Sequence, residues 1–453
     1  MGDSLTRQEK LDNLCQEKLG QIDWTIIKPN ESGDWTSQRN TEFTAYAPLG
    51  DKKSTSGATK VFKTYSLGLS TNRDAWCYNY SRTAVGANIR RMIDVYNEQV
   101  DQVQMGTISL EAAEEDPKLI NWSAGLRGAL RARRKYNFNP HNVIEGVYRP
   151  FCRQAVYFDG GLNERVSQLK DMYPSPKHRN LGILLTGPSS HFEFTPFMVD
   201  ALPNLHTLDS CQFFPRWVYT KEEIPDGQLD LGNSTDGVDK YGYRRVDNIT
   251  DEILAAYRSS YGADVDKDDV FHYVYGLLHS PDYRFMYAAD LTKMLPRIPK
   301  VARTADFEVF VAVGRQLASL HLGYETAEPY PLTEVVKEGA PIDAAALYRV
   351  TKMKYGPKKD KSKLVYNTWV TLERIPAEAH EYMLGPRSGI DWLIDRYQVK
   401  TDKKSGIVND PNDWAAEHAN PRYIVDLIKR VTTVSIRTVE LVSQLPKLQV
   451  LNS

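Results

Sequence analysis

The longest regular hydrophobic pattern in the chain lies near its C-terminus, between Pro421 and Leu445. Apolar residues recur there every three or four positions, with charged residues between them, which predicts an amphipathic helix with one core-facing stripe. Pro421 suits the first helical position, where a missing backbone N–H costs nothing. The stripe comprises Ile424, Leu427, Ile428, Val431, Val434, Thr438, Val442 and Leu445. The chain is therefore expected to close with a long helix.

Helical spacing recurs in residues 89–103, 119–136, 251–261, 267–295 and 305–319. Short apolar runs bounded by Pro and Gly predict strands within residues 143–160 and 181–186. Residues 347–354 and 364–372 are expected to form a β-hairpin around a lysine-rich loop, and residues 206–245 a long irregular surface excursion. The predicted fold class is mixed α/β (α+β), with a small sheet core, several helices, a β-hairpin and the long C-terminal helix.

Three parts of the chain differ in pattern. Residues 1–45 combine a short helical pattern with a polar Pro/Gly/Asn/Ser segment, which is typical of a connector from an upstream part. Residues 46–330 are predicted to form the main α/β domain. Residues 331–453 are predicted to add the hairpin and a C-terminal helical part packed on that domain.

Composition narrows the function classes. With a formal net charge of −1, the chain lacks a whole-chain basic excess, so any nucleic-acid surface must be local. The four cysteines are scattered and form no CxxC pair, so we expect buried reduced thiols and neither disulfides nor zinc; they are Cys15, Cys77, Cys152 and Cys211. The N-terminus is polar, and no apolar run approaches the ~18 residues of a membrane span. A cytoplasmic protein with no membrane partner is expected.

Catalytic motifs are absent from the sequence. The segment 184–194 has one glycine and no GK[ST], so it is not a nucleotide-binding loop, and no dinucleotide fingerprint occurs. Neither the tetrapeptide of amino-methyltransferases nor the acidic run of a metal-dependent nuclease is present. We therefore expect no catalytic, metal or cofactor site in this chain.

Two weaker patterns leave alternatives open. The acidic run 264–269 resembles half of a calcium loop, but Asp269 and Tyr275 occupy the positions that require Gly and Glu, so helix capping is the other interpretation. His191 lies near Glu193, and His272 and His279 share one helical face. These histidines are either core and surface residues or bases of a site without a local motif.

Local positive charge is the main remaining signal. Predicted phosphate contacts lie in three clusters: Arg127, Arg131, Arg133 and Arg134; Lys354, Lys358, Lys359, Lys361 and Lys363; and Lys403 and Lys404. Lys135, Lys352 and Lys400 extend them. Such clusters neutralise DNA phosphates in a salt-sensitive, sequence-independent way. The alternative is a soluble turn or a protected sheet edge.

Four stretches carry a family resemblance: VFKTYSLGLSTNRDAWCYNYSRTAVGANIRRMIDVYNEQV (61–100), YRPFCRQAVYFD (148–159), YGLLHSPDYRFMYAADLTKMLPRIP (275–299) and RSGIDWLIDRYQVKTDKKSGIVNDPNDW (387–414). They resemble the C-terminal specificity (target-recognition) region of type ISP restriction–modification enzymes, from about residue 4 onward. The resemblance implies a module without catalysis of its own. It also implies that S-adenosylmethionine, ATP and Mg²⁺ sites lie in upstream domains, with residues 1–45 leading from a methyltransferase-like part.

The resemblance also implies which residues form the shared framework and which read bases. Members read different DNA sequences, so shared residues are expected to build the fold, hold the DNA backbone or face the methyltransferase near the extruded adenine. These are Thr71, Asn72, Arg73, Asp74, Trp76, Tyr78, Asn79, Arg149, Pro150, Phe151, Arg387, Ser388, Trp392, Asp395 and Arg396. Base-reading residues are expected in the loops 354–363 and 216–243.

Three functional hypotheses follow. The first is sequence-specific recognition of double-stranded DNA, with an adenine methyltransferase and ATPase-translocase supplied in cis or in trans. The second is a protein–protein docking module for those catalytic parts. The third is an enzyme with an unrecognised hydrolytic site.

Overall fold

The computed structural model describes residues 6–16, 25–52, 59–188, 190–222 and 237–451. Helix α14 (Tyr423–Ser443) confirms the predicted C-terminal helix, and its apolar stripe is buried over most of its length. The prediction for Pro421 was wrong by two positions, because Arg422 is the N-cap and the proline lies in the preceding turn.

Local capping sets both ends of helix α3 (Arg82–Met105). This helix starts at Ser81, whose side chain accepts from the Ala84 N–H, and it stops at the left-handed Gly106. The prediction of one helix over 119–136 was wrong, since only α4 (Ala124–Arg131) forms and Arg133 adopts a positive φ of 52°. Helices α6 (Asp251–Tyr261) and α10 (Thr304–Leu322) confirm their predictions.

The predicted helix over 267–295 is three helices: α7 (Lys267–His279), α8 (Pro281–Met286) and α9 (Ala288–Lys293). Pro281 lacks a backbone N–H and cannot continue α7, and Ser280 caps the next helix by accepting from the Tyr283 N–H. The remaining short helices are α1 (Arg7–Gln16), α2 (Asp74–Cys77), α5 (Leu169–Met172), α11 (Ala344–Leu347), α12 (Gly389–Arg396) and α13 (Pro411–Glu417).

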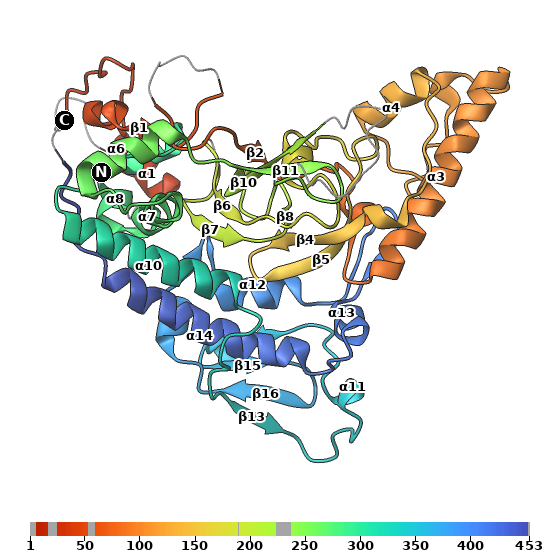
Figure 1. Ribbon diagram of the computed structural model, residues 1–453. Helices are drawn as coiled ribbons and strands as arrows, with labels where there is room; N and C mark the ends of the chain where they lie inside the picture. Colours follow the sequence, from red (N-terminus) through yellow and green to blue (C-terminus); the bar gives the residue numbers. More distant parts are fainter. Residues whose placement is uncertain (1–5, 17–24, 53–58, 189, 223–236, 452–453) are drawn as a thin grey trace.

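Two four-stranded sheets form the middle of the molecule (Figure 1). One has the order β3-β5-β4-β8, with β3 (Tyr78–Asn79), β4 (Val143–Arg149), β5 (Cys152–Tyr157) and β8 (Leu202–Pro203). The other has the order β2-β9-β6-β7, with β2 (Ser66–Leu67), β6 (Gly182–Leu185), β7 (Pro196–Val199) and β9 (Gln212–Pro215). These strands confirm the strand predictions for 143–160 and 181–186.

The expectation of an irregular excursion over 206–245 was wrong. Besides β9, this region and its continuation form an antiparallel two-stranded ribbon of β10 (Trp217–Lys221) and β11 (Tyr243–Asp247). The partners are separated by a long connection, so short-range pattern did not reveal their pairing. Residues 223–236 of the predicted reading loop lie outside the described residues.

A third sheet, in the order β13-β16-β15-β14, contains β13 (Thr333–Val336), β14 (Lys354–Tyr355), β15 (Lys363–Val365) and β16 (Val370–Glu373). The lysine-rich loop joins two paired strands, as predicted, but they are β14 and β15. The predicted strand over 347–354 was wrong: Leu347 ends α11, residues 348–353 are irregular, and only Lys354 of that segment enters the sheet. Three small strand pairs complete the fold: β1 (Ala47–Pro48) with β12 (Arg297–Ile298), β17 (Met383–Leu384) with β18 (Arg387–Ser388), and β19 (Lys400–Thr401) with β20 (Val408–Asn409).

Helices α7, α10 and α14 cover one side of the central sheets, whereas α3 and α4 project at the opposite end and β13–β16 lie below (Figure 1). Close approach of α7 and α10 depends on glycine, because a Cβ on Gly314 would lie 1.9 Å from the His272 carbonyl oxygen. Cys77, Cys152 and Cys211 are buried thiols, and the side chain of Cys15 lies outside the described part. Among the described residues, no helix is long and apolar enough to cross a membrane.

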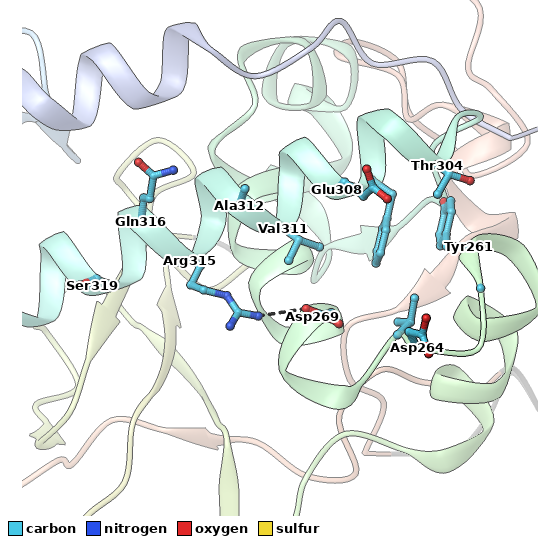
Figure 2. Close-up of a pocket in the computed structure, with 13 residues that line it drawn as sticks. Tyr261, Asp264, Asp269, Thr304, Glu308, Val311, Ala312, Arg315, Gln316 and Ser319 are labelled. Carbon is cyan, nitrogen blue, oxygen red and sulfur yellow. Dashed lines mark hydrogen bonds and ion pairs between the residues drawn. The ribbon is translucent and has the colours of Figure 1, made fainter.

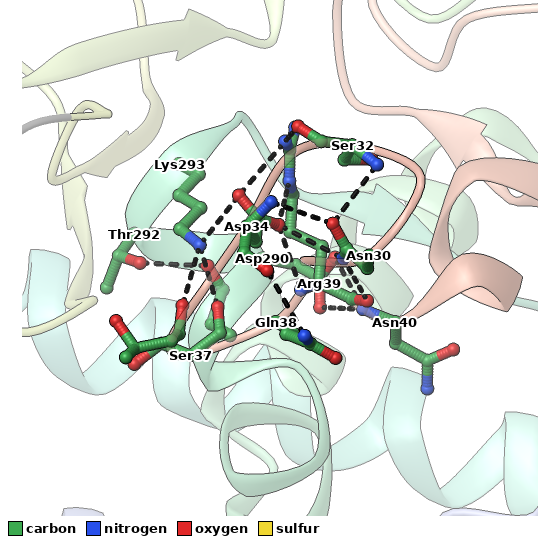
Figure 3. A network of polar contacts seen from close by, with 12 residues as sticks. Asn30, Ser32, Asp34, Ser37, Gln38, Arg39, Asn40, Asp290, Thr292 and Lys293 are labelled. Carbon is green, nitrogen blue, oxygen red and sulfur yellow. Dashed lines mark hydrogen bonds and ion pairs between the residues drawn. The ribbon is translucent and has the colours of Figure 1, made fainter. Parts of the chain in front are cut away.

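Residues 28–40 are fastened to α9 by a polar network (Figure 3). Asp34 pairs with Arg39 at 2.8 Å and with Lys293 at 3.0 Å. Lys293 also donates to the Ser37 carbonyl at 2.7 Å, and the Asp290 carboxylate accepts from the Asn40 N–H at 3.1 Å. This part of the predicted connector therefore has one defined path over the helices. The domain boundaries proposed at residues 45 and 330 stay a prediction.

Candidate nucleic-acid interface

The first predicted basic cluster lies at the end of α4. Arg127 pairs with Glu115 at 2.6 Å and lies 5.1 Å from the Trp122 ring centroid, so part of its charge is neutralised. Arg131, Arg133 and Arg134 are exposed beyond it. Lys135 pairs with Asp101 on α3 at 2.5 Å. The cluster is accessible, and three of its arginines point their charge into solvent.

The second cluster is the loop between β14 and β15. Lys358 and Lys359 are exposed, and both adopt positive φ in the short 3-10 helix Pro357–Lys359. Lys363 pairs with Glu373 at 2.9 Å, and Lys361 lies 3.7 Å from the Asp391 carboxylate. The α4 cluster and this loop are at different ends of the molecule (Figure 1), so they do not form one patch. Lys354 in β14 and Lys352 just before it are also exposed.

The third predicted cluster, Lys403 and Lys404, is exposed in the turn between β19 and β20. The Asp402 carboxylate shapes this turn by accepting from the Ser405 N–H at 2.8 Å and from its hydroxyl at 2.7 Å. Strand β20 is tied to the central sheet, because the Asn79 amide donates to the Val408 carbonyl at 2.9 Å. The two lysines are thus carried by a turn whose base is fixed.

Next to this turn, the structure brings together a fourth cluster, whose members the sequence predicted only in separate groups: three in the shared stretches and Lys400 beside the third basic cluster. Arg387, Arg396 and Lys400 surround the single carboxylate of Asp395. The Arg387–Asp395 distance is 3.0 Å and the Lys400–Asp395 distance is 3.8 Å, while Arg396 contacts the same oxygen as Arg387. Lys400 also donates to the Asp395 carbonyl at 2.9 Å. We call Arg387, Asp395, Arg396 and Lys400 the Asp395 cluster.

The Asp395 cluster carries more positive than negative charge. Burial raises the pKa of Asp395, but the charge of Arg396 and the further charges of Lys400 and Arg387 outweigh it, and the pKa is lowered. Burial, followed by repulsion from Arg396, lowers the pKa of Lys400. One carboxylate among three cations leaves a surplus of about two positive charges, which favours an anionic partner.

Arg149, the last residue of β4, acts on two of the same groups as Arg396 of the Asp395 cluster, Tyr148 and Cys152. Its guanidinium stacks 4.1 Å from the Tyr148 ring centroid and donates to the Asn204 side chain at 3.2 Å. The positive charges of Arg149 and Arg396 both act on the Tyr148 hydroxyl, although burial is the larger influence and raises its pKa. Arg149 therefore extends the positive field of the Asp395 cluster.

The other shared-stretch residues lie mostly inside the protein. Arg73 is buried and donates to the Asn121 carbonyl at 3.1 Å, to the Ser123 hydroxyl at 2.5 Å and to the Leu162 carbonyl. Asn72 adopts a positive φ of 54°, Asp74 accepts from Thr71, and Phe151 sits in the β4–β5 turn at φ 56°. The other buried members are Thr71, Trp76, Tyr78, Asn79, Pro150, Phe151, Ser388 and Trp392. These positions support the scaffold that carries the cationic side chains.

Comparison of the chain with models of known protein families identifies its family. The family model described as the type ISP C-terminal specificity domain matches residues 60–427. The chain belongs to the type ISP C-terminal specificity domain family. No curated protein matches the chain.

Solved structures that resemble this chain support the family assignment. The specificity domain is 34% identical, with a TM-score of 0.82, to a nuclease-deletion mutant of the type ISP restriction–modification enzyme LlaGI in complex with a DNA substrate mimic. It is 33% identical (TM-score 0.80) to the ATP-dependent type ISP enzyme LlaBIII bound to DNA and 29% identical (TM-score 0.79) to DrdV in a DNA complex. The matches cover 100%, 94% and 98% of this chain but only 39%, 26% and 42% of those chains. The chain thus spans less than half the length of each.

A groove of about 670 Å³ lies between α10 and the α6–α7 turn of the specificity domain (Figure 2). Asp264 and Asp269 from the acidic run line it, and Asp269 pairs with Arg315 at 3.0 Å. Asp266 and Asp269 form a reciprocal capping box at the start of α7, which confirms the capping interpretation. Among the described residues, no group of three His, Cys, Asp or Glu side chains converges on a possible metal position.

The histidines of the specificity domain occupy different environments. His279 is buried and its Nδ1 lies 2.9 Å from the Tyr275 carbonyl, while the side chain of His191 is 92% exposed and 3.1 Å from Asp209. His272 bonds to the Asp268 carbonyl at 2.7 Å. His178, which sequence reasoning did not single out, lies 2.7 Å from both Ser175 and Asp239. That contact joins the α5–β6 connection to the turn that precedes β11.

Proposed function

We propose that this specificity domain binds a particular sequence of double-stranded DNA and thereby positions catalytic parts of a restriction–modification enzyme. Family membership supports the recognition role, and LlaGI, LlaBIII and DrdV are all described in DNA complexes. The observation that carries the proposal is the Asp395 cluster, where three cations share one carboxylate. Such a surplus charge is the feature that DNA phosphates neutralise.

The specificity domain makes two kinds of contact with DNA. The Asp395 cluster, Arg149 and the exposed lysines of the β19–β20 turn hold the sugar–phosphate backbone, which fixes register without reading sequence. The exposed arginines beyond α4 and the β14–β15 lysines add contacts where the duplex reaches them. Side chains that approach base edges provide the discrimination.

No chemistry is assigned to this chain in the proposal. Adenine methylation, ATP-driven translocation and DNA cleavage belong to parts outside it, supplied in cis or in trans, and S-adenosylmethionine, ATP and Mg²⁺ are bound there. The domain contributes the orientation of the DNA relative to those parts. This division explains why the sequence carries a recognition framework without an enzyme motif.

A selection of bound duplexes tests the proposal. The full chain is mixed with a library of random-sequence duplexes, and bound DNA is sequenced after several rounds. We expect one recurring motif, with binding at least 1,000-fold tighter than to random DNA. Equal recovery of all sequences would overturn the proposal.

Charge variants identify the backbone contacts. Arg396→Gln should weaken binding to the selected duplex and to unrelated duplexes by the same factor, since a phosphate contact is blind to sequence. Arg437→Gln, on the exposed face of α14 where Arg437 pairs with Glu440 at 3.5 Å, is the matched control and should change neither affinity.

A docking role for the upstream part is a second proposal. On α8, Phe285 is 88% exposed and Met286 is 47% exposed, next to the helix to which residues 28–40 are fastened. An upstream part that enters along this segment would cover them. Phe285→Ser should abolish co-purification with a separately produced methyltransferase part while leaving duplex affinity unchanged. Retained co-purification would exclude this surface.

A further inference from the structure

The β10–β11 ribbon stands apart from the larger sheets. Its two strands form a sheet of their own, in a register that places Tyr219 opposite Arg245 and Lys221 opposite Tyr243. Arg244 of β11 also bridges Val238 in the segment before that strand. It lies on the side of the molecule away from β13–β16 (Figure 1). Lys221 and Arg245 are exposed along it. A two-stranded ribbon of this width fits the major groove of B-form DNA.

Arg216 anchors the ribbon directly before its first residue, Trp217. This guanidinium is only 4% exposed, and it pairs with Asp247 of β11 at 2.6 Å and with Asp268 of α7 at 2.7 Å. It also stacks 4.0 Å from the ring centroid of Trp217. Two carboxylates therefore hold Arg216 in place, and Arg216 in turn holds the indole.

Arg245 stacks on the same indole, with its guanidinium carbon 4.4 Å from the Trp217 ring centroid. Side chains at positions 217, 219 and 245 share one face of the ribbon, because the residues are paired in register or two positions apart. No carboxylate of the described residues forms an ion pair with Arg245. Its charge is exposed, while stacking limits the orientation of its plane.

The far end of the ribbon is also fixed. His178 is buried, and its ring contacts Tyr219, Tyr241 and Tyr243 edgewise or at a tilt. Its hydrogen bond with Asp239 holds the turn before β11. Asp239 also accepts from the Tyr241 and Tyr243 N–H groups at 2.8 and 3.1 Å. The described ends of both strands are thus tied to the body of the domain.

An arginine in this setting has the properties of a base-reading residue. A planar guanidinium presents two parallel N–H donors, which match O6 and N7 of guanine in the major groove. Stacking on an indole restricts the side chain before binding, so less rotamer freedom is lost when the contact forms. A surface arginine that only provided solubility would need neither the stack nor the buried Arg216 beneath it.

We propose that the β10–β11 ribbon enters the major groove and that Arg245, supported by Trp217 and Arg216, reads a guanine of the target. This inference rests on the proposed DNA-binding function and adds to it one specificity-determining residue with its base. Arg216 is a positioning residue: it touches no DNA and acts through Trp217.

The test uses the wild-type chain and the motif that it selects. Each G·C pair of the selected duplex is replaced in turn, and guanine is also replaced by 7-deazaguanine, which lacks the N7 acceptor. At one position, replacement of the pair should weaken wild-type binding roughly 5- to 150-fold. 7-Deazaguanine at that same position should also weaken wild-type binding, because Arg245 then loses the N7 acceptor.

The variants Arg245→Gln and Arg245→Lys should then lose discrimination at that position only, because lysine keeps the charge but not the paired donors. Arg437→Gln is the matched loss of one exposed arginine and should leave every preference intact. If Arg245→Gln weakens all sequences alike, Arg245 contacts phosphate and the inference is wrong. If the variant binds and discriminates as wild type does, the ribbon does not read DNA.

The outcomes separate this inference from the function on which it rests. A wild-type chain that selects no motif refutes both. A wild-type chain that selects a motif, with unchanged preferences in both Arg245 variants, refutes only the inference. Arg216→Met, which removes the support beneath the indole, should reduce discrimination at the same position as Arg245→Gln.

Discussion

Acidification should destabilise the protein through two buried histidines that link α7, α10 and α14. His279 of α7 is 4% exposed, and its ring centroid lies 5.6 Å from that of His321 of α10. His321 bonds to the Tyr275 hydroxyl at 2.6 Å and to the Thr438 hydroxyl of α14 at 2.9 Å. The other charged or titratable groups acting on this pair are Arg284 and Tyr382.

Burial lowers the pKa of His279 to about 4, and burial together with the charge of His279 lowers the pKa of His321 well below its ordinary value. In the unfolded chain both imidazoles regain a pKa of about 6.5. Below pH 6.5 the unfolded state therefore binds more protons than the folded state, so stability falls as the pH falls. Between pH 7 and pH 5 each histidine should remove about 2 kcal/mol.

Urea denaturation at pH 7, 6 and 5, at constant ionic strength, measures this loss. The wild type should lose about 4 kcal/mol from the pair across this range, and His279→Leu should lose about 2 kcal/mol less than the wild type. Paired carboxylates change the stability at lower pH than the histidines do. Burial raises the pKa of Glu334, but hydrogen bonds from Arg422, Tyr348 and Lys429 bring that pKa down to about 2. Replacement of the exposed His141 by Gln is the control. An unchanged pH dependence in His279→Leu would refute the reasoning.

Two further predictions concern the scaffold. Gly314→Ala should destabilise the fold by about 3 kcal/mol in urea denaturation, because its Cβ would lie 1.9 Å from the His272 carbonyl oxygen. The control Gly128→Ala in α4 places its Cβ within 4 Å of no other atom and should be neutral or stabilising. Equal effects of the two variants would contradict the close packing of α7 and α10. Asp34→Asn should speed tryptic cleavage at Arg39, since it removes the carboxylate that pairs with Arg39 and Lys293. The control Asp12→Asn in α1 should leave the cleavage rate unchanged. Identical cleavage rates in the two variants would show that the network does not hold residues 28–40.

Local sequence signals predicted local structure well. The stripe of α14 is read from one helix period, and β4 and β5 are read from apolar runs bounded by turn residues. The sequence also contains a local signal for the helix break within 267–295, because Pro281 lacks the backbone N–H that would continue α7. Because apolar spacing continues across Pro281, periodicity alone predicts one helix there.

The two sites that carry the functional proposals depend on contacts between separate segments. The Asp395 cluster forms because β18, the end of α12 and β19 meet, although its basic residues are spread over fourteen positions with aspartates between them. Trp217 and Arg245 meet only through the β10–β11 pairing. Charge counting along the sequence selects runs such as 354–363, and it cannot detect cations that tertiary folding gathers around one carboxylate.

The salt dependence of DNA binding tests the central claim most directly. Affinity for a selected duplex is measured from 50 to 200 mM salt for the wild type, for the triple variant Arg387→Gln/Arg396→Gln/Lys400→Gln and for Arg437→Gln. Each phosphate contact makes the slope of log affinity against log salt concentration more negative by about 0.9. We predict a steep negative slope for the wild type and for Arg437→Gln, and a slope shallower by about 2 to 3 for the triple variant. A wild-type affinity that does not change with salt, or a triple variant with the wild-type slope, would contradict the account.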